Sequence, residues 1–90
     1  MSDKIIVVII MKELRSIVNL NSYGRVSIHL KEIMEEKEIT RYRLAKLADT
    51  RFEVVEKWCS GTVERIDSDV LARFCYILNC EITDIVKYHI

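Results

Sequence analysis

The pattern of apolar and polar residues separates the first 24 residues from the rest of the chain. Residues 4–11 read KIIVVIIM, with six consecutive β-branched residues behind a lysine. Such side chains lose rotamer freedom in a helix, so this stretch favours a strand. Apolar residues then recur at helical spacing up to residue 20, and a connection follows. The pattern predicts an N-terminal extension over residues 1–24, with a short strand and a helix.

The pattern of residues 25–90 predicts one helical domain. Val26, Ile28 and Leu30 alternate briefly, as in a short strand, before the apolar positions take up helical spacing. Turn and cap residues then divide the domain into five helices, expected at about 28–37, from Thr40 to about 48, at about 52–59, from Asp67 or Ser68 to Asn79, and over 84–88 after Thr83. The expected fold class is therefore all-α, a compact five-helix domain that follows the extension.

Two of these helices have the features of a helix-turn-helix. Steep crossing of two short helices requires a small residue inside the first and a tight turn after it. Ala45 is that small residue, and Asp49, four residues later, tolerates the left-handed conformation of such a turn. Val55 is placed to bury against the preceding helix, and Trp58 is expected in the core. A plain helical bundle with the same spacings is the alternative reading of this pattern.

Charge narrows the choice of partner only through its distribution. The chain has 14 Lys and Arg residues against 14 Asp and Glu residues, so no overall basic field points to a nucleic acid. Between residues 41 and 51, however, Arg41, Arg43, Lys46 and Arg51 stand against Asp49 alone. A patch that faces phosphate groups is therefore expected in this stretch.

Several functional classes find no support in the sequence. The three cysteines form no C-x-x-C pair, and His29 and His89 are far from them in sequence, so we expect no metal site and no cofactor. The thiols are expected to be small buried side chains in a reducing cytoplasm. No motif of a phosphate-binding loop, a nucleophile elbow or a zinc protease is present, so an enzyme is not expected. Seven apolar residues in the extension are too few for a membrane helix, which needs about 20.

From about residue 28 to residue 88 the chain resembles the phage-repressor/Cro-like helix-turn-helix regulators, the XRE family. Members commonly read K-x-x-x-T-Q-x-x-L-A, a turn with glycine, and a serine-led recognition helix that ends in W-x-x-G. A stretch like I-D-x-D-x-L-A-x-x-C-x-x-L-x-C and a closing D-I-x-x-Y follow. The matching residues here are Lys37, Thr40, Leu44, Ala45, Trp58, Gly61, Ile66, Asp67, Asp69, Leu71, Ala72, Cys75, Leu78, Cys80, Asp84, Ile85 and Tyr88.

The chain departs from this pattern in and around the helix-turn-helix. Arg41 stands where the family has glutamine, a residue that contacts phosphate and braces the recognition helix, and arginine can also bind phosphate. Asp49 replaces the turn glycine, and Thr50 replaces an apolar residue. Arg51 replaces the serine that leads the recognition helix, which removes a cap and adds a cation.

The resemblance implies a cytoplasmic, homodimeric regulator of transcription, for example a repressor, that binds a pseudo-palindromic site on double-stranded DNA. It implies that helix 52–59 enters the major groove as the recognition helix. The side chains expected to face bases are Arg51, Phe52, Glu53, Glu56 and Lys57, and those expected to hold phosphates are Thr40, Arg41, Arg43 and Arg65. For the basic residues a solvated helix surface is the alternative. For Phe52 the alternatives are contact with a thymine methyl group and a partly buried edge of the core. No small-molecule effector is expected.

Two other functions remain open from the sequence. The acidic residues Glu53 and Glu56 share one face of helix 52–59, so the same face could bind a basic protein instead of DNA. A structural scaffold that assembles through its N-terminal strand is the third reading. On each reading an exposed apolar strand invites association, so the extension is expected to pair with residues 25–29, with its own copy, or with both. The residues expected at this dimer contact are Ile5, Val7 and Ile9.

Overall fold

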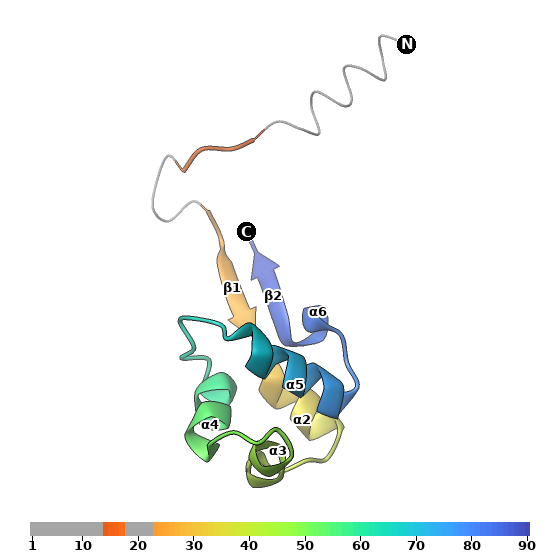
Figure 1. Cartoon of the computed structure of the whole chain (residues 1–90). Coiled ribbons are helices and arrows are strands. Elements are labelled where there is room, and N and C mark those ends of the chain that lie inside the picture. The colour runs from red at the N-terminus through yellow and green to blue at the C-terminus, as the bar shows by residue number, and fades with distance from the viewer. Residues whose placement is uncertain (1–13, 18–22) are drawn as a thin grey trace.

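The computed structural model describes residues 14–17 and 23–90 of the chain. These residues form five helices and two strands, in the order β1 (Arg25–Ile28), α2 (Leu30–Glu36), α3 (Arg41–Leu47), α4 (Phe52–Ser60), α5 (Ser68–Leu78), α6 (Ile82–Ile85) and β2 (Val86–His89). The expected five-helix architecture is confirmed, and a two-stranded sheet is added to it. Figure 1 shows that this sheet extends from the helices on the side opposite to α3. The expected strand and dimer contact at Ile5, Val7 and Ile9 lie outside the described residues.

The helices are held together by one apolar core to which every helix contributes. Its buried side chains are Leu30, Met34, Leu44, Ala45, Ala48, Val55, Trp58, Leu71, Phe74, Leu78 and Ile85. At the centre, the rings of Trp58 and Phe74 meet edge to face with 5.3 Å between their centroids, a geometry that aromatic quadrupoles favour. The prediction that Trp58 belongs to the core is confirmed. The core fixes α4, the expected recognition helix, against α2 and α5.

Local capping chemistry explains where most helices begin and end. The Thr40 hydroxyl oxygen accepts the backbone N–H of Arg43 at 3.1 Å, which satisfies one of the free N–H groups at the start of α3. Asp67 caps α5 in the same way. Gly61 ends α4 and Asn79 ends α5, each with a positive φ, of 73° and 50° respectively. These four predicted caps are confirmed.

The prediction of a fifth helix over residues 84–88, with Thr83 as its cap, is wrong. Helix α6 spans Ile82–Ile85 and its N-cap is Glu81, which forms a capping box with Asp84. The chain then continues as β2, which pairs antiparallel with β1 so that Ile28 lies opposite Val86. Residues 86–89 form a strand and not a helix because apolar and polar residues alternate in both segments and can pair across the ladder. For the same reason the first helix begins at Leu30 and not at residue 28, since residues 25–28 belong to β1.

A close approach of two backbones fixes the outer end of the sheet. The Tyr88 hydroxyl donates a hydrogen bond of 2.7 Å to the carbonyl oxygen of Tyr23. The next residue, Gly24, has a φ of 81°, and a Cβ atom at this position would lie 2.3 Å from the carbonyl oxygen of His89. Only glycine fits this conformation and this distance.

Within residues 14–17 and 23–90 we find no helix with the length and apolar composition needed to span a bilayer.

Candidate nucleic-acid interface

Helices α3 and α4 form the helix-turn-helix that the sequence predicts. Ala45 is buried on α3, and Val55 on α4 is fully enclosed in the core. Asp49 in the turn has a φ of 51°, the left-handed conformation that was expected there. The backbone N–H of Thr50 closes the turn with a bond of 3.0 Å to the carbonyl oxygen of Ala45. The turn therefore joins the C-terminal end of α3 to the head of α4.

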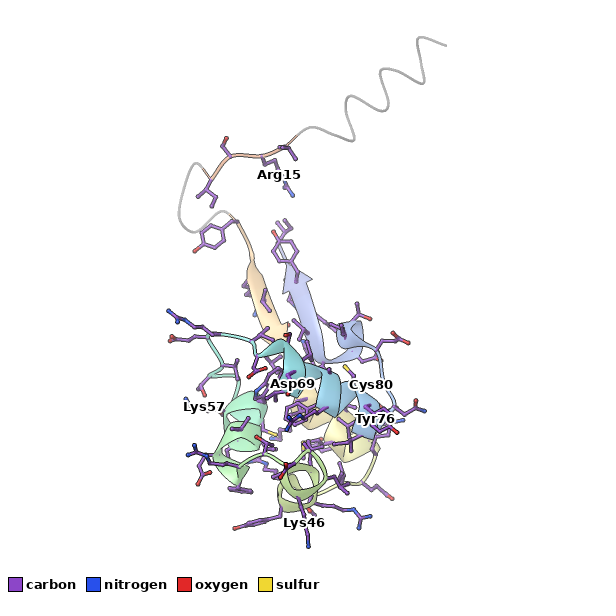
Figure 2. All side chains as sticks on the ribbon, viewed as in Figure 1. Arg15, Lys46, Lys57, Asp69, Tyr76 and Cys80 are labelled. Atoms are coloured by element: carbon purple, nitrogen blue, oxygen red, sulfur yellow. The ribbon has the colours of Figure 1, made fainter. Side chains whose placement is uncertain are left out.

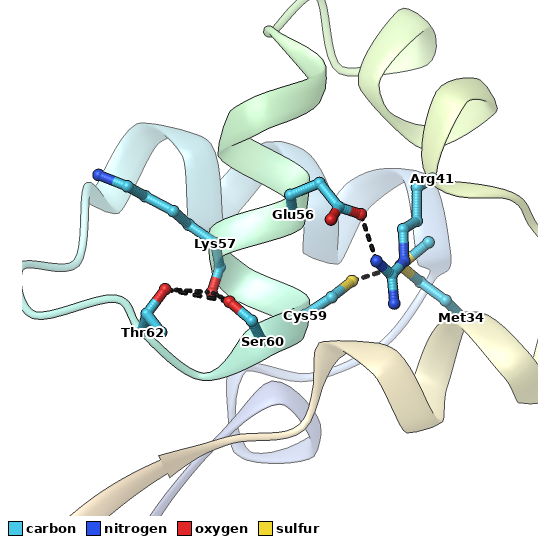
Figure 3. Close-up of polar contacts among 7 residues, drawn as sticks. All are labelled: Met34, Arg41, Glu56, Lys57, Cys59, Ser60 and Thr62. Atoms are coloured by element: carbon cyan, nitrogen blue, oxygen red, sulfur yellow. Dashed lines mark hydrogen bonds and ion pairs between the residues drawn. The ribbon is translucent and has the colours of Figure 1, made fainter.

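An ion pair joins the head of α3 to the middle of α4. The Nη1 atom of Arg41 donates to the Oε1 atom of Glu56, as Figure 3 shows. The side chains are 39% and 41% exposed, so the pair lies at the rim of the surface that both helices present. The hydrogen bond to Glu56 raises the pKa of Arg41 above its usual value. The structure thus brings together one residue expected to hold phosphate and one expected to face bases.

A pair of aromatic rings lies at the heads of the same two helices. Tyr42 and Phe52 stack with 4.3 Å between ring centroids and 21° between ring planes. Tyr42 is 73% exposed, whereas Phe52 is half-buried, so the pair is a surface feature outside the buried core. Sequence reasoning missed Tyr42, because nothing in the spacing of residues 42 and 52 indicates that their rings meet. One face of Phe52 is therefore covered by Tyr42.

The remaining candidate residues lie along α3, along α4 and in the loop after α4, and this loop, with Arg65, is at the end of α4 opposite its head. The exposed basic side chains among them are Arg43 on α3, Arg51 at the N-cap of α4, Lys57 on α4 and Arg65 in the loop that follows. Lys46 on α3 and Lys57 on α4 are labelled in Figure 2. Glu53 is also exposed, and in the part of the chain that the structure describes it makes no ion pair. The surface of α3 and α4 is therefore mixed in charge, with cations in the majority.

Comparison with known proteins agrees with this geometry. The family model for the Cro/C1-type HTH DNA-binding domain matches residues 29–89. The chain belongs to this family. A comparison with curated proteins gives no significant match. Among solved structures, one described as "Crystal structure of a putative DNA-binding protein from Bacteroides fragilis" is similar, with a TM-score of 0.64 and 21% sequence identity over 70% of this chain and 100% of that chain. This neighbour supports the fold, and the family match confirms the resemblance seen in the sequence.

Sequence reasoning also missed a contact to the turn of this Cro/C1-type domain. Arg73 on α5 directs its Nη1 atom at two backbone oxygens of the turn, those of Ala48 at 2.9 Å and Asp49 at 3.3 Å. Its Nη2 atom lies 2.8 Å from an Oδ2 atom of Asp69, one helical turn earlier on α5. In the sequence Arg73 is an ordinary basic residue on a helix, and no local pattern points to the turn.

The cysteines of the domain are free thiols at partly buried positions. Burial raises the pKa of Cys59 and of Cys75, and it raises the pKa of Cys80 to about 11. The Cys59 thiol packs 3.6 Å from the thioether sulfur of Met34 (Figure 3). A thiol with a raised pKa is a poor nucleophile and a poor metal ligand at neutral pH. Among the described residues, no group of three or more His, Cys, Asp or Glu side chains is placed to hold a metal ion.

The two histidines meet across the sheet although they are 60 positions apart in the sequence. Each Nε2 atom, of His29 and of His89, lies 2.7 Å from the hydroxyl oxygen of Ser27. The Nδ1 atom of His29 lies 3.3 Å from Glu32. A hydroxyl has a single proton, so Ser27 donates to one imidazole and accepts from the other. This group links β1 to β2 on the side of the molecule away from α3.

Proposed function

We propose that this Cro/C1-type domain regulates transcription by binding double-stranded DNA as a homodimer, with α4 in the major groove. The observation that carries the proposal is the arrangement at the heads of α3 and α4. The ion pair of Arg41 with Glu56 and the stacked rings of Tyr42 and Phe52 both connect α3 to α4 at the surface, where Arg43 and Arg51 are also exposed. In helix-turn-helix docking the head of the second helix meets base edges while the first helix crosses the backbone.

In this proposal the phosphate contacts come from Thr40, Arg41, Arg43 and Arg65. Arg43 and Arg65 are exposed, and the Thr40 hydroxyl still has a proton to donate after it accepts the N–H of Arg43. Arg41 is held in place by Glu56 through Nη1, and a guanidinium has five N–H groups, so others are left to donate. A phosphate can therefore share Arg41 with Glu56 or displace the carboxylate. These contacts would set the register of the protein on the duplex without reading its sequence.

The base contacts in this proposal come from Arg51, Phe52, Glu53, Glu56 and Lys57. Two of these side chains are carboxylates, which oppose the approach of DNA, but the two differ. Glu56 is compensated by Arg41, whereas Glu53 makes no ion pair within the described residues. Repulsion from the duplex therefore comes chiefly from Glu53, and a cytosine N4 amino group that donates to this carboxylate would offset it. The acidic face then lowers affinity for most sequences and favours a subset of sites.

Dimerisation is proposed to involve the sheet. In the described part of the chain β1 and β2 pair only with each other, so each strand has an outer edge with free backbone groups. Val26 and Tyr88 are exposed on this sheet, at 57% and 59%. An edge of this kind accepts a further strand, either from a second copy or from the segment that contains Ile5, Val7 and Ile9. A two-fold contact here would also present two copies of α4 to two half-sites.

The test measures binding of the full chain to labelled duplexes by fluorescence anisotropy. One duplex pool has random sequence, and a second is enriched from that pool over several rounds by the wild-type protein. We expect binding to both at low salt, tighter binding to the enriched pool, and affinity that falls as salt rises. Failure to bind either pool at low salt would reject the proposal.

A second candidate function is recognition of a basic protein by the same face of α4. The observation that favours it is the compensation of Arg41 by Glu56, which lowers the net positive charge where DNA would bind. The variant Glu53→Gln separates the two functions. We expect it to bind the random duplex more tightly, whereas a chain that binds a basic protein and not DNA would show no duplex binding in either form.

A further inference from the structure

We infer that Arg73 of α5 determines how α4 is oriented, because it clamps the two peptide units on either side of Asp49 in the turn. Its effect on DNA recognition rests on the proposed function, whereas its effect on the turn does not. Arg73 is a positioning residue in this inference, since it touches the turn and not the DNA. It also stabilises a left-handed conformation that turns usually assign to glycine.

The turn needs such support because of the residue at its centre. Asp49 has a φ of 51°, where the Cβ atom of an L-residue approaches the following carbonyl oxygen. Asp tolerates this conformation better than most residues, but it remains less favourable than glycine there. The strain lies at the one link between α3 and α4. A small change in the φ and ψ angles of Asp49 would therefore swing α4 relative to α3.

The geometry of the clamp matches this requirement. The carbonyl of Ala48 belongs to the peptide unit before the Cα atom of Asp49, and the carbonyl of Asp49 belongs to the peptide unit after it. Arg73 Nη1 donates to both, at 2.9 Å and 3.3 Å. The relative direction of these two peptide units is set by φ and ψ of Asp49, so one nitrogen bound to both oxygens holds both angles.

The guanidinium is itself fixed by a second contact. Arg73 Nη2 lies 2.8 Å from the carboxylate of Asp69, four residues earlier on the same helix. The two side chains are 43% and 69% exposed, so this ion pair adds little stability by itself. Its effect is to orient the planar group, which leaves Nη1 directed at the turn. A lysine has the same charge but no rigid fork, so it cannot reproduce both contacts.

The electrostatics of the turn favour a cation at this place. The last carbonyl groups of α3 have no partner within the helix, and they form the negative end of its dipole. From a neighbouring helix, Arg73 supplies donors and positive charge at this end, to the carbonyl oxygen of Ala48, the C-cap of α3, and to that of Asp49 after it. The clamp thus ties the turn to α5, which is anchored in the core through Leu71, Phe74 and Leu78.

Loss of the Arg73 contacts should affect base recognition more than phosphate binding, because the two sets of residues lie on opposite sides of the turn. The phosphate-contacting residues Arg41 and Arg43 lie on α3, before the turn, whereas Phe52 and Glu53 lie on α4, after it. Loosening the turn misplaces the second set relative to the first. Preference for the enriched duplex over the random duplex should fall, while the salt dependence, which counts phosphate contacts, should stay the same.

The experiment compares Arg73→Met and Arg73→Lys with wild type in the full chain. Lys37→Met is the control, because it removes one cation from the C-terminal end of α2 without touching the turn. The first measurement is hydrogen exchange at the backbone N–H of Thr50, which closes the turn on Ala45. The second is the ratio of affinities for the enriched and random duplexes, with its salt slope.

We expect faster exchange at Thr50 in both Arg73 variants and a preference ratio that falls roughly 2- to 30-fold, the range for residues that act through a packed network. Lys37→Met should show neither effect. Adding Asp49→Gly to Arg73→Met should restore most of the preference, because glycine adopts the left-handed conformation without a clamp. This rescue would not occur if Arg73 only stabilised the fold.

Unchanged exchange at Thr50 in both Arg73 variants would overturn the inference, as would a loss of preference that Asp49→Gly does not repair. A chain that shows faster exchange in the variants but binds neither duplex would support the clamp and reject the proposed function. If Arg73→Met fails to fold, Arg73→Lys and the double variant decide by the same two measurements.

Discussion

Replacing Glu56 with glutamine should increase the affinity of the protein for random-sequence DNA. The substitution keeps the size of the side chain, removes a carboxylate from the face of α4, and weakens its hold on Arg41. Both effects favour phosphate binding. Both side chains of the pair are about two-fifths exposed, so water already weakens their attraction. The substitution releases one guanidinium in each subunit, so the gain in affinity cannot exceed that of one complete phosphate contact per subunit.

This limit gives the expected magnitude. Each phosphate contact contributes a slope of about −0.9 to the dependence of log affinity on log salt. Between 200 and 50 mM salt, one such contact changes affinity by roughly 3.5-fold, and two contacts in a dimer change it by roughly 12-fold. Arg41 can supply one such contact in each subunit, so we expect the steepening of the slope by Glu56→Gln and its flattening by Arg41→Ala to add up to about 0.9 per subunit.

The assay measures duplex binding by fluorescence anisotropy at a series of salt concentrations. Glu36→Gln, at the exposed C-terminal end of α2, removes the same charge and serves as the control. In the double variant Arg41→Ala/Glu56→Gln the slope should equal that of Arg41→Ala, because no guanidinium remains to be released. If Glu56→Gln and Glu36→Gln have the same affinity and slope, the reasoning is refuted and the Arg41–Glu56 pair does not lie at the DNA.

Three further expectations concern the stability of the domain. Phe74→Ala should lower the free energy of unfolding in urea by roughly 3–5 kcal/mol, because it empties the centre of the core beside Trp58; a change below 1 kcal/mol would contradict this packing. Gly24→Ala should destabilise the sheet, seen as faster hydrogen exchange in β1 and β2, whereas Gly61→Ala, which has open space around it, should leave the sheet unchanged. The folded pKa of Cys80 is raised to about 11 from an ordinary value of 9.0, so the stability that it contributes is complete below pH 9 and is lost as pH rises toward 11. Urea titrations at pH 8 and pH 10.5 should therefore show a smaller alkaline loss for Cys80→Ala than for wild type, and an equal loss would contradict the burial of this thiol.

The features that the sequence predicted well depend on local chemistry. Thr40 caps α3, Gly61 ends α4 and Asn79 ends α5, because each conformation follows from one residue and its immediate neighbours. The buried face of α3 follows from helical spacing in the same way. These local features, with the family resemblance, were sufficient to predict the five-helix fold.

The features that the sequence did not predict depend on contacts between distant segments. Strand β2 forms because β1, about 60 positions earlier, offers a matching ladder, and four alternating residues are too few to indicate this alone. The partners of Arg41 and Arg73 depend on the crossing of helices, since long side chains reach several neighbours. For the same reason the sequence did not indicate that Glu56 of α4 meets Arg41 of α3.

The central claim is that α3 and α4 bind duplex DNA, and titration of the isotopically labelled full chain with the enriched duplex tests it most directly. Backbone NMR signals report each residue separately, so they show which surface the DNA contacts. We expect the largest shifts in residues 40–43 and 51–57 and around Arg65, with small shifts at His29 and His89 on the far side of the molecule. Shifts confined to β1 and β2, or no shifts at a concentration where the duplex is bound, would contradict the claim.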